Sequence, residues 1–338
     1  MCIGRAGSTA DHPWHAYLAA LPTSSPEPTS WPSRLREELR ATPVGASLAA
    51  ARDVVQRVYD GFVARLARER RDLIPAGIDN VDALLWARGM CRSRSFPISL
   101  EAIGPAKEAE PVPALEGMEE TSSGVLLPFF DLLNHRYGQP IEWTSNSKHV
   151  AFTTLCVIKS GDEVYNNYGS RPNEELLFSY GFCIRDNAMD AVSLVLACKT
   201  DAGLSRKRFY VRREMNGGVP PELFKAMAAL TYEEAEGEPE DQEEQDVQDS
   251  VGLEEIEALV AALSHKFSAL EESREKDDLL LAAVPPLAGD LRELHIAIYR
   301  NGQREILSEV LENYKALMQQ AANDDEDASS SDLEHSAK

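Results

Sequence analysis

Residues 126–136 read LLPFFDLLNHR, and this stretch determines how the rest of the chain is interpreted. It is apolar except for one charged residue, Asp131, until it ends abruptly in Asn134 and His135. An amide and an imidazole at the end of an apolar run most often form a structural cap or turn. Two chemical interpretations are also open, a metal site and a nucleophilic hydrolase.

The metal interpretation pairs Asp131 with His135 at four-residue spacing, but a metal needs further ligands and none lies nearby. The hydrolase interpretation needs a cysteine activated by a histidine that an asparagine orients. Here the Asn and His are adjacent, and no cysteine stands in a recognisable nucleophile setting. The five cysteines are scattered, without a CxxC pair, which suits a reducing compartment and excludes a sequence-readable zinc site.

The composition predicts a globular protein with acidic appendages. A chain of 338 residues with 43 % hydrophobic content is long enough for two cores. Most of the net charge of -22 lies in residues 233–249 and 324–338, so we expect an acidic disordered loop at 233–250 and an acidic disordered tail at 323–338. The mildly acidic remainder argues against direct binding of nucleic acid, which requires clustered Lys and Arg.

No membrane or export signal is evident in the sequence. No apolar segment approaches the length that spans a bilayer, and MCIGRAGSTADH lacks the regions of a signal peptide. The sequence therefore predicts a soluble intracellular chain with no membrane partner.

Apolar spacing predicts helices first, then short strands, then helices again. An amphipathic helix is expected at residues 47–70, and a second begins at the cap Asn80. The Gly-, Pro- and Glu-rich residues 104–124 are typical of a surface loop. Four short strands follow, VLLPFF, IEWT, HVAFTTLCVI and VYNNY, and then a helix over NEELLFSY, capped by Asn173 and stopped by Gly181.

After a last strand at residues 191–198, the pattern becomes helical to the end of the chain. Apolar stripes predict helices around residues 253–270 and 291–317, with a break in the second at Asn301 and Gly302. We therefore expect a second, all-helical domain. The overall fold class is α+β.

A second unusual segment is GDEVYNNYGSRPNEELLFSYGF, residues 161–182. One tyrosine at the end of a strand is ordinary packing. Two tyrosines that each precede a glycine, on either side of a capped helix, are harder to explain as packing alone. Glycines permit tight turns that bring main-chain carbonyls close to a ligand.

Together, DLLNH, GDEVYNNYG and NEELLFSYGF resemble the C-terminal half of a SET-domain lysine methyltransferase. The branch in question includes the Rubisco large-subunit methyltransferase, the actin-histidine methyltransferase and fungal enzymes acting on ribosomal proteins and elongation factors. HPWHAYLAALP and TSWP resemble the start of its helical insert, WARGMCRSRSF the return to the SET core, and LHIAIYRNGQREIL its helical substrate-binding domain.

The resemblance implies a SET β-fold of short sheets with a helical insert, followed by an all-α substrate-binding domain. It places the insert-like region at residues 1–90 and the C-terminal half of the SET domain at 91–200. The substrate-binding-like domain then covers residues 201–322, and the tail covers 323–338.

The resemblance also implies roles for individual residues. Asn134 and His135 would line the S-adenosylmethionine pocket, and Ser93, Arg94 and Asp131 correspond to further pocket positions. Tyr168 takes the place of the catalytic tyrosine, which also contacts the cofactor. The channel for the target side chain would be lined by Tyr165, Tyr180 and Phe182.

The implied reaction is methyl transfer from S-adenosylmethionine to a lysine of a protein substrate. Asn166 and Asn167 before Tyr168 resemble the fungal versions, which favours a ribosomal protein or an elongation factor as the target. The expected location is the cytoplasm, the nucleus or both. The alternative function is a non-catalytic protein-binding module.

One departure from the family concerns the N-terminal SET half and its GxGL-type motif, which MCIGRAG does not match. Without those strands we expect open sheet edges and exposed apolar surface, unless a partner covers them. The sequence is also compatible with an incomplete gene model whose full-length product is an ordinary enzyme of the family.

Overall fold

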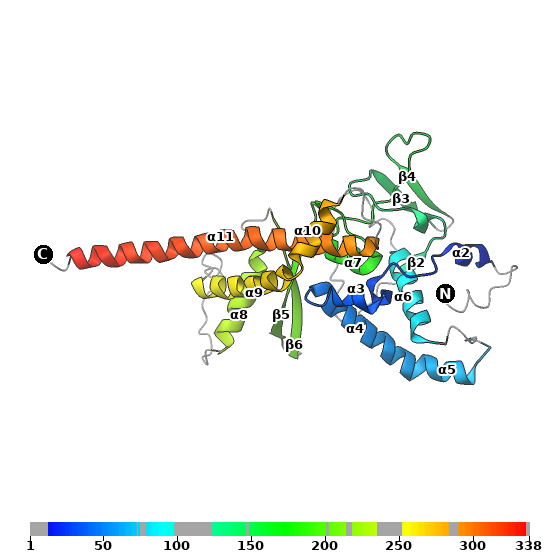
Figure 1. Ribbon diagram of the computed structural model, residues 1–338, viewed down its shortest axis with the longest axis horizontal. Helices are drawn as coiled ribbons and strands as arrows, with labels where there is room; N and C mark the ends of the chain where they lie inside the picture. The colour runs from blue at the N-terminus through cyan, green and yellow to red at the C-terminus, as the bar shows by residue number, and fades with distance from the viewer. Residues whose placement is uncertain are drawn as a thin grey trace. The chain divides into compact units, whose positions relative to one another are not determined.

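The computed structural model describes residues 13–72, 74, 79–97, 124–146, 149–200, 203–213, 218–234, 252–283 and 290–335 (Figure 1). The chain forms two compact units. The first comprises residues 1–189 and 288–296, and the second comprises residues 190–287 and 297–338. The first stretch of the first unit ends at residue 189, before the boundary expected after residue 200, and the strand expected at 191–198 lies in the second unit.

The first unit begins with helices. They are α2 (His15–Ala20), η1 (Pro28–Ser30), α3 (Ser33–Glu37), α4 (Pro43–Val58), η2 (Tyr59–Val63), α5 (Ala64–Glu69) and α6 (Val81–Arg94). The helix predicted at 47–70 is observed as α4, η2 and α5 in succession, and it starts earlier because the Thr42 side chain accepts a hydrogen bond from the amide of Gly45. The predicted cap Asn80 is confirmed, since its side chain accepts from the amide of Ala83.

Two small antiparallel sheets follow in the first unit. Strand β1 (Ser95–Pro97) pairs with β2 (Gly124–Leu126), and β3 (Ile141–Ser145) pairs with β4 (Val150–Thr154). Aromatic rings of Phe96, Phe130, Trp143 and Phe152 form the core between them. Residues 98–123, which include most of the predicted surface loop, lie outside the described residues.

Apolar side chains are exposed around these sheets, as the sequence predicts. Phe129 is 73 % exposed and Val157 is 92 % exposed. Phe129 also has a positive φ of 80°, which is unusual for a bulky residue and follows directly on Pro128. The predicted strand VYNNY is not observed; Asn166 forms only an isolated bridge with His135.

Helix α7 (Asn173–Tyr180) closes this part of the unit. It ends at Gly181, as predicted, because Gly181 adopts φ 77° and a Cβ there would lie 2.0 Å from the carbonyl oxygen of Pro26. The prediction that Asn173 caps the helix is wrong, since the N-cap is Pro172. The Asn173 side chain instead accepts from the amide of Ile184 at 2.8 Å and donates to its carbonyl at 3.0 Å, which fixes the chain beyond the helix.

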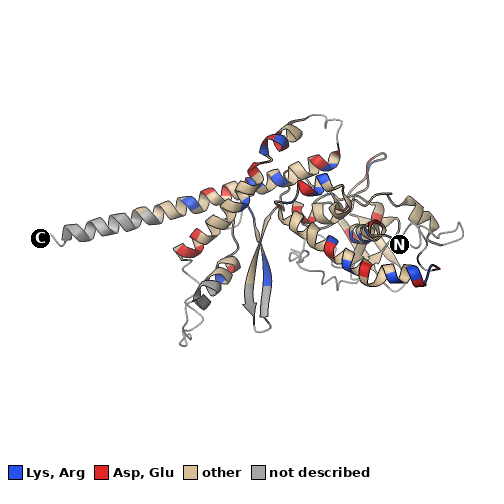
Figure 2. Ribbon diagram, turned by 60° about the horizontal axis from the view of Figure 1, so that its bottom comes forward, with Lys and Arg blue, Asp and Glu red and all other residues tan. Residues whose placement is uncertain are grey.

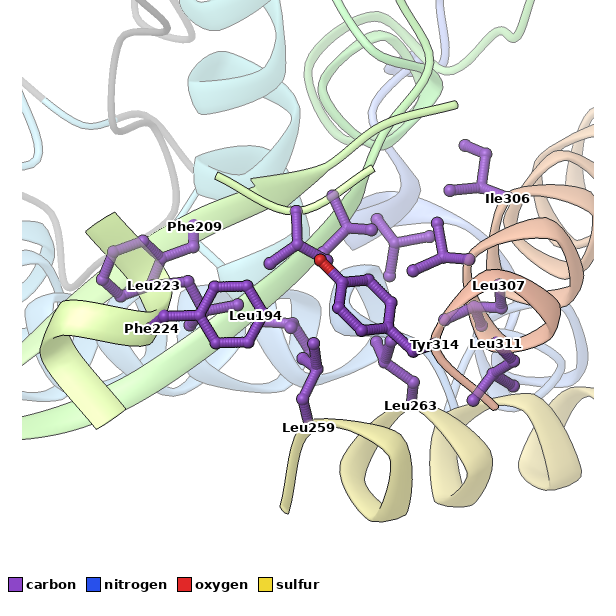
Figure 3. Close-up of a cluster of buried hydrophobic side chains, with 14 of the residues drawn as sticks. Leu194, Phe209, Leu223, Phe224, Leu259, Leu263, Ile306, Leu307, Leu311 and Tyr314 are labelled. Atoms are coloured by element: carbon purple, nitrogen blue, oxygen red, sulfur yellow. The ribbon is translucent and has the colours of Figure 1, made fainter. Parts of the chain in front are cut away.

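The second unit packs helices on a β-hairpin. Strands β5 (Val192–Thr200) and β6 (Gly203–Val211) are antiparallel, and the helices are α8 (Pro221–Glu234), α9 (Leu253–Glu271), α10 (Arg274–Ala282) and most of α11 (Leu291–His335). The expectation of an all-helical domain from residue 201 is wrong for β6. Side chains alternate between the two faces of β6, so Phe209 and Val211 both point into the core, beside Val192 and Leu194 of β5. Leucines of α9 and α11 cover these four side chains (Figure 3).

Helix α11 is continuous, so the predicted break at Asn301 and Gly302 is wrong. A Cβ at Gly302 would lie 2.5 Å from the Asp190 carboxylate, so the glycine permits close approach and does not end the helix. The helix also extends to His335, over most of the predicted disordered tail. A helix that is already formed by packing can extend without a new nucleation step. The predicted acidic loop lies outside the described residues except for residues 233 and 234, which end α8.

Lys and Arg alternate with Asp and Glu along most helices (Figure 2). Strand β6 is different, since Arg206, Lys207 and Arg208 are consecutive there. Among the described residues, no helix is both long enough and apolar enough to cross a bilayer.

Candidate functional site

Two segments of the first unit cross at the NH motif. The carbonyl of Asn134 accepts a hydrogen bond from the amide of Asn166 at 2.8 Å, and the amide of Arg136 donates to the carbonyl of Asn166 at 2.9 Å. The buried Asn166 side chain accepts from Trp143 Nε1 at 3.3 Å and from the amide of Asn167 at 2.8 Å. These bonds hold the two predicted motifs, NH and NNYG, side by side.

His135 and Tyr168 are directly coupled across this crossing. The amide of Tyr168 donates to His135 Nδ1 at 3.0 Å, and the two rings stack with centroids 5.0 Å apart. The Tyr168 hydroxyl donates to the carbonyl oxygen of Leu133 at 2.7 Å. Because Nδ1 accepts a hydrogen bond, the neutral imidazole carries its proton on Nε2.

Tyr180 and Phe182 extend the pair into an aromatic cluster. Ring centroids lie 4.8 Å apart for Tyr168 and Tyr180, 6.1 Å for Tyr180 and Phe182, and 6.2 Å for His135 and Phe182. Burial, and to a lesser extent Tyr180, raises the pKa of Tyr168 above its usual value. Its hydroxyl therefore stays protonated at neutral pH and can donate a hydrogen bond.

A polar cluster adjoins the aromatic one. Oδ2 of the buried Asp131 carboxylate accepts two hydrogen bonds, one from Arg94 Nη1 at 3.1 Å and one from the Tyr17 hydroxyl at 2.6 Å. Arg94 Nη1 also donates to the backbone carbonyl of Asp131 at 3.0 Å. The predicted pair Arg94 and Asp131 is thus brought together. Ser93 is turned into its own helix, since its hydroxyl donates to the carbonyl of Gly89 at 2.8 Å.

Two predicted residues lie outside these clusters. The Asn134 side chain is exposed and donates to Glu163 Oε1 at 2.7 Å. Tyr165, predicted to line the channel, lies under the Arg136 guanidinium at 3.7 Å from its ring centroid and hydrogen-bonds to Glu163.

Sequence reasoning missed Tyr17 and Arg171. Arg171 Nε donates to the Tyr168 carbonyl at 2.8 Å, and Nη1 donates to Glu175 at 2.8 Å, which ties the NNYG turn to α7. Tyr17 belongs to HPWHAYLAALP, and the resemblance of this segment to a helical insert does not indicate a contact with Asp131. Among the described residues, no three His, Cys, Asp or Glu side chains are grouped as metal ligands.

The environment of His135 predicts a pH dependence of stability. Burial, followed by the charge of Arg171, lowers the pKa of His135 to about 4, well below its value in an unfolded chain. Between pH 6.5, the ordinary histidine value, and pH 4 the unfolded chain therefore binds the extra proton, so the free energy of unfolding falls as the pH falls.

Urea denaturation of the wild type and His135→Gln at several pH values in this window tests the prediction. We expect the wild type to lose more stability on acidification than the variant. His295, whose pKa burial also lowers, is present in both proteins, so its contribution cancels in the comparison. Parallel stability curves for the two proteins would contradict the assigned pKa.

Comparisons with known proteins identify relatives of this chain. It is 36 % identical over 123 residues to the ribosomal lysine N-methyltransferase set10 of Schizosaccharomyces pombe, and 33 % identical over 119 residues to ribosomal lysine N-methyltransferase 1 of Saccharomyces cerevisiae. These matches cover 36 % and 35 % of this chain, but only 20 % and 18 % of those proteins. The human N-lysine methyltransferase SETD6 is 23 % identical over 60 % of this chain and 41 % of its own length. No family model matches the sequence.

Among solved structures, the chain resembles the SET domain of LSMT bound to lysine and AdoHcy, with a TM-score of 0.64 at 19 % identity. Rubisco LSMT bound to AdoMet gives the same score and identity. The alignment to the lysine complex covers 92 % of this chain and 72 % of the LSMT chain. The predicted fold is therefore confirmed, and the chain is related to SET-domain protein-lysine methyltransferases.

Proposed function

We propose that this chain transfers a methyl group from S-adenosylmethionine to a lysine side chain of a protein. The observation that carries the proposal is Tyr168, whose hydroxyl is held on the Leu133 carbonyl inside the cluster of His135, Tyr180 and Phe182. The relatives support it, since two of them, at 36 % and 33 % identity, are named as lysine methyltransferases. The matched segment spans about a fifth of these relatives, so the activity is proposed for this chain by analogy with part of them.

The described residues fit S-adenosylmethionine by the chemistry of their side chains. Asn134 is exposed and offers an amide that can both donate and accept, and the neutral His135 adds no positive charge beside a cationic ligand. The faces of aromatic rings attract a cationic group such as a sulfonium. When bound, S-adenosylmethionine would supply a sulfonium methyl group that a neutral amine can attack, with S-adenosylhomocysteine as the leaving group.

The chain's own residues would orient the acceptor and exclude water. Tyr180 and Phe182 are brought to Tyr168 by α7 and the turn at Gly181, so apolar ring faces surround the hydroxyl. Because the pKa of Tyr168 is raised, its hydroxyl acts as a hydrogen-bonding group and not as the base. Burial among aromatic rings favours the neutral form of a lysine amine, which is the nucleophile.

We further propose a protein of the translation machinery as the substrate, in the cytoplasm or the nucleus. Two fungal relatives are named ribosomal lysine N-methyltransferases, and a third from Saccharomyces cerevisiae is named protein-lysine N-methyltransferase EFM1. Incubation of the chain with labelled S-adenosylmethionine and yeast ribosomal subunits or purified elongation factors tests the two substrate classes separately.

Titration of S-adenosylmethionine into the purified chain by calorimetry tests the site itself. We expect saturable binding that the double variant Asn134→Ala, His135→Ala loses. Replacing the exposed Arg136 by alanine next to the motif provides a matched control that leaves both predicted pocket side chains in place. A folded wild-type chain that shows no binding would contradict the proposed function of this polypeptide and favour a protein-binding module.

A further inference from the structure

Tyr17 contacts the proposed site from a distant part of the chain. It lies on α2, 114 residues before Asp131, and its hydroxyl donates to Asp131 Oδ2 at 2.6 Å. Its ring packs against the small core of Leu18, Leu21 and Met90. The phenol is therefore held in place by packing and loses little freedom when it binds the carboxylate.

The two oxygens of Asp131 are used unequally. Oδ2 accepts from both Tyr17 and Arg94, whereas Oδ1 is buried without a hydrogen-bond partner among the described residues. A buried acceptor without a partner is unfavourable, so such atoms in native proteins call for an explanation. A donor that arrives with a ligand is one such explanation.

Asp131 lies beside the group proposed to take part in the reaction. The Tyr168 hydroxyl is bonded to the carbonyl of Leu133, two residues after Asp131. Burial is the main cause of the raised pKa of Tyr168. The charge of Asp131 raises this pKa further and the charge of Arg94 lowers it, both by smaller amounts. The Tyr168 phenol and the Arg94 guanidinium are therefore bonded to backbone carbonyls only two residues apart, those of Leu133 and Asp131.

We propose that Tyr17 is a positioning residue for the methyl acceptor. By holding Oδ2 together with Arg94, it keeps Oδ1 of Asp131 available to accept an N–H from the target lysine amine beside Tyr168. The inference rests on the proposed function, and it adds a residue on α2 to the site. It predicts that loss of the Tyr17 hydroxyl weakens binding of the acceptor and leaves binding of the nucleotide portion unchanged.

Calorimetry with two small probes tests the proposal without turnover. The chain is first saturated with S-adenosylhomocysteine and then titrated with free L-lysine. For Tyr17→Phe we expect lysine to bind about tenfold more weakly, which corresponds to about 1.4 kcal/mol. The affinity for S-adenosylhomocysteine should stay unchanged.

Tyr59→Phe is the matched control, because it also removes one phenol hydroxyl, here from a bond to the Asp79 carbonyl. Asp131→Asn should weaken lysine binding at least as much as Tyr17→Phe. Lysine binding by Tyr17→Phe with wild-type affinity, or a parallel loss of both probes, would overturn the inference and leave the proposed function intact. A wild type that binds S-adenosylhomocysteine but no lysine would overturn the inference alone. A wild type that does not bind S-adenosylhomocysteine would overturn both.

Discussion

Replacing Tyr168 with phenylalanine is expected to lower the rate of methyl transfer at least about a hundredfold while S-adenosylmethionine still binds. Loss of one preorganised hydrogen-bonding group at a reacting centre typically costs 10²–10³-fold in rate. The phenylalanine ring keeps the stacking on His135 and Tyr180, so the cluster should retain its shape. Only the bond between the hydroxyl and the Leu133 carbonyl is removed.

Rates from a radiolabel transfer assay and affinities from calorimetry separate the two effects. Tyr137→Phe is a suitable control, because Tyr137 is 46 % exposed and lies close to the NH motif in sequence without belonging to the aromatic cluster. Transfer by Tyr168→Phe at the wild-type rate would refute the role of the hydroxyl. Loss of cofactor binding together with loss of transfer would show that Tyr168 shapes the pocket and does not act on the acceptor.

The part of the site that the sequence predicts is the part that lies within short motifs. Asn134, His135 and Tyr168 occur in two segments whose residues are unusual together, and the structure brings these segments into contact through Asn166. Tyr17 could not be predicted, because its hydrogen bond to Asp131 depends on how two segments far apart in sequence pack. Nor could the sequence predict that the Tyr165 ring would lie under the Arg136 guanidinium, because residue type alone does not tell which neighbour a ring contacts.

The fold shows the same division between local and distant effects. Asn80 caps its helix through the amide of Ala83, and Gly181 ends its helix with a positive φ, so both are correctly predicted from local patterns. Gly302 was read as a helix break because glycine is unfavourable in an isolated helix. In the folded chain it allows the close approach of the Asp190 carboxylate, 112 residues away in sequence, which a local pattern cannot reveal.

The exposed apolar surface of the first unit bears on the proposed activity. Phe129, Leu155 and Val157 are more than half exposed near sheets of only two strands. The alignment matches 72 % of the solved LSMT chain. Apolar side chains at the edges of such small sheets are therefore in contact with solvent in the described part of this unit.

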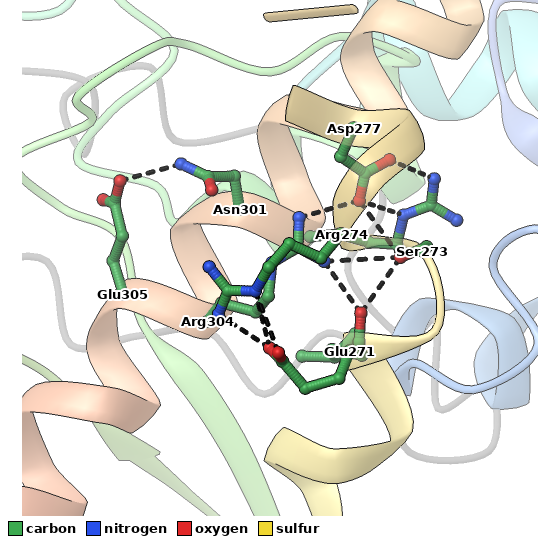
Figure 4. Close-up of polar contacts among 9 residues, drawn as sticks. Glu271, Ser273, Arg274, Asp277, Asn301, Arg304 and Glu305 are labelled. Carbon is green, nitrogen blue, oxygen red and sulfur yellow. Dashed lines mark hydrogen bonds and ion pairs between the residues drawn. The ribbon is translucent and has the colours of Figure 1, made fainter. Parts of the chain in front are cut away.

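Stability of the second unit depends on a buried charge cluster that joins α10 to α11. The Asp277 carboxylate accepts hydrogen bonds from Arg300 Nε at 3.0 Å, from Arg304 Nη2 at 2.8 Å and from the Ser273 hydroxyl at 3.1 Å (Figure 4). The side chain of Asp277 is fully covered, and those of Arg300 and Arg304 are 5 % and 2 % exposed. One carboxylate therefore neutralises part of the charge of two buried guanidinium groups.

Asp277→Ala is expected to lower the free energy of unfolding by about 3–5 kcal/mol, because removal of one partner leaves a buried charge uncompensated. Urea denaturation followed by circular dichroism measures the loss. Asp278→Ala is the matched control, since Asp278 is the adjacent aspartate, is exposed, and should change stability by less than about 0.5 kcal/mol. Asp277→Asn keeps the shape and one acceptor oxygen but removes the charge. The loss of unfolding free energy in this variant would therefore measure the contribution of the charge, and the additional loss in Asp277→Ala would measure that of shape and hydrogen bonding. If Asp277→Ala were as stable as Asp278→Ala, the cluster would be shown to contribute nothing, and α10 would have to be held to α11 by apolar packing alone.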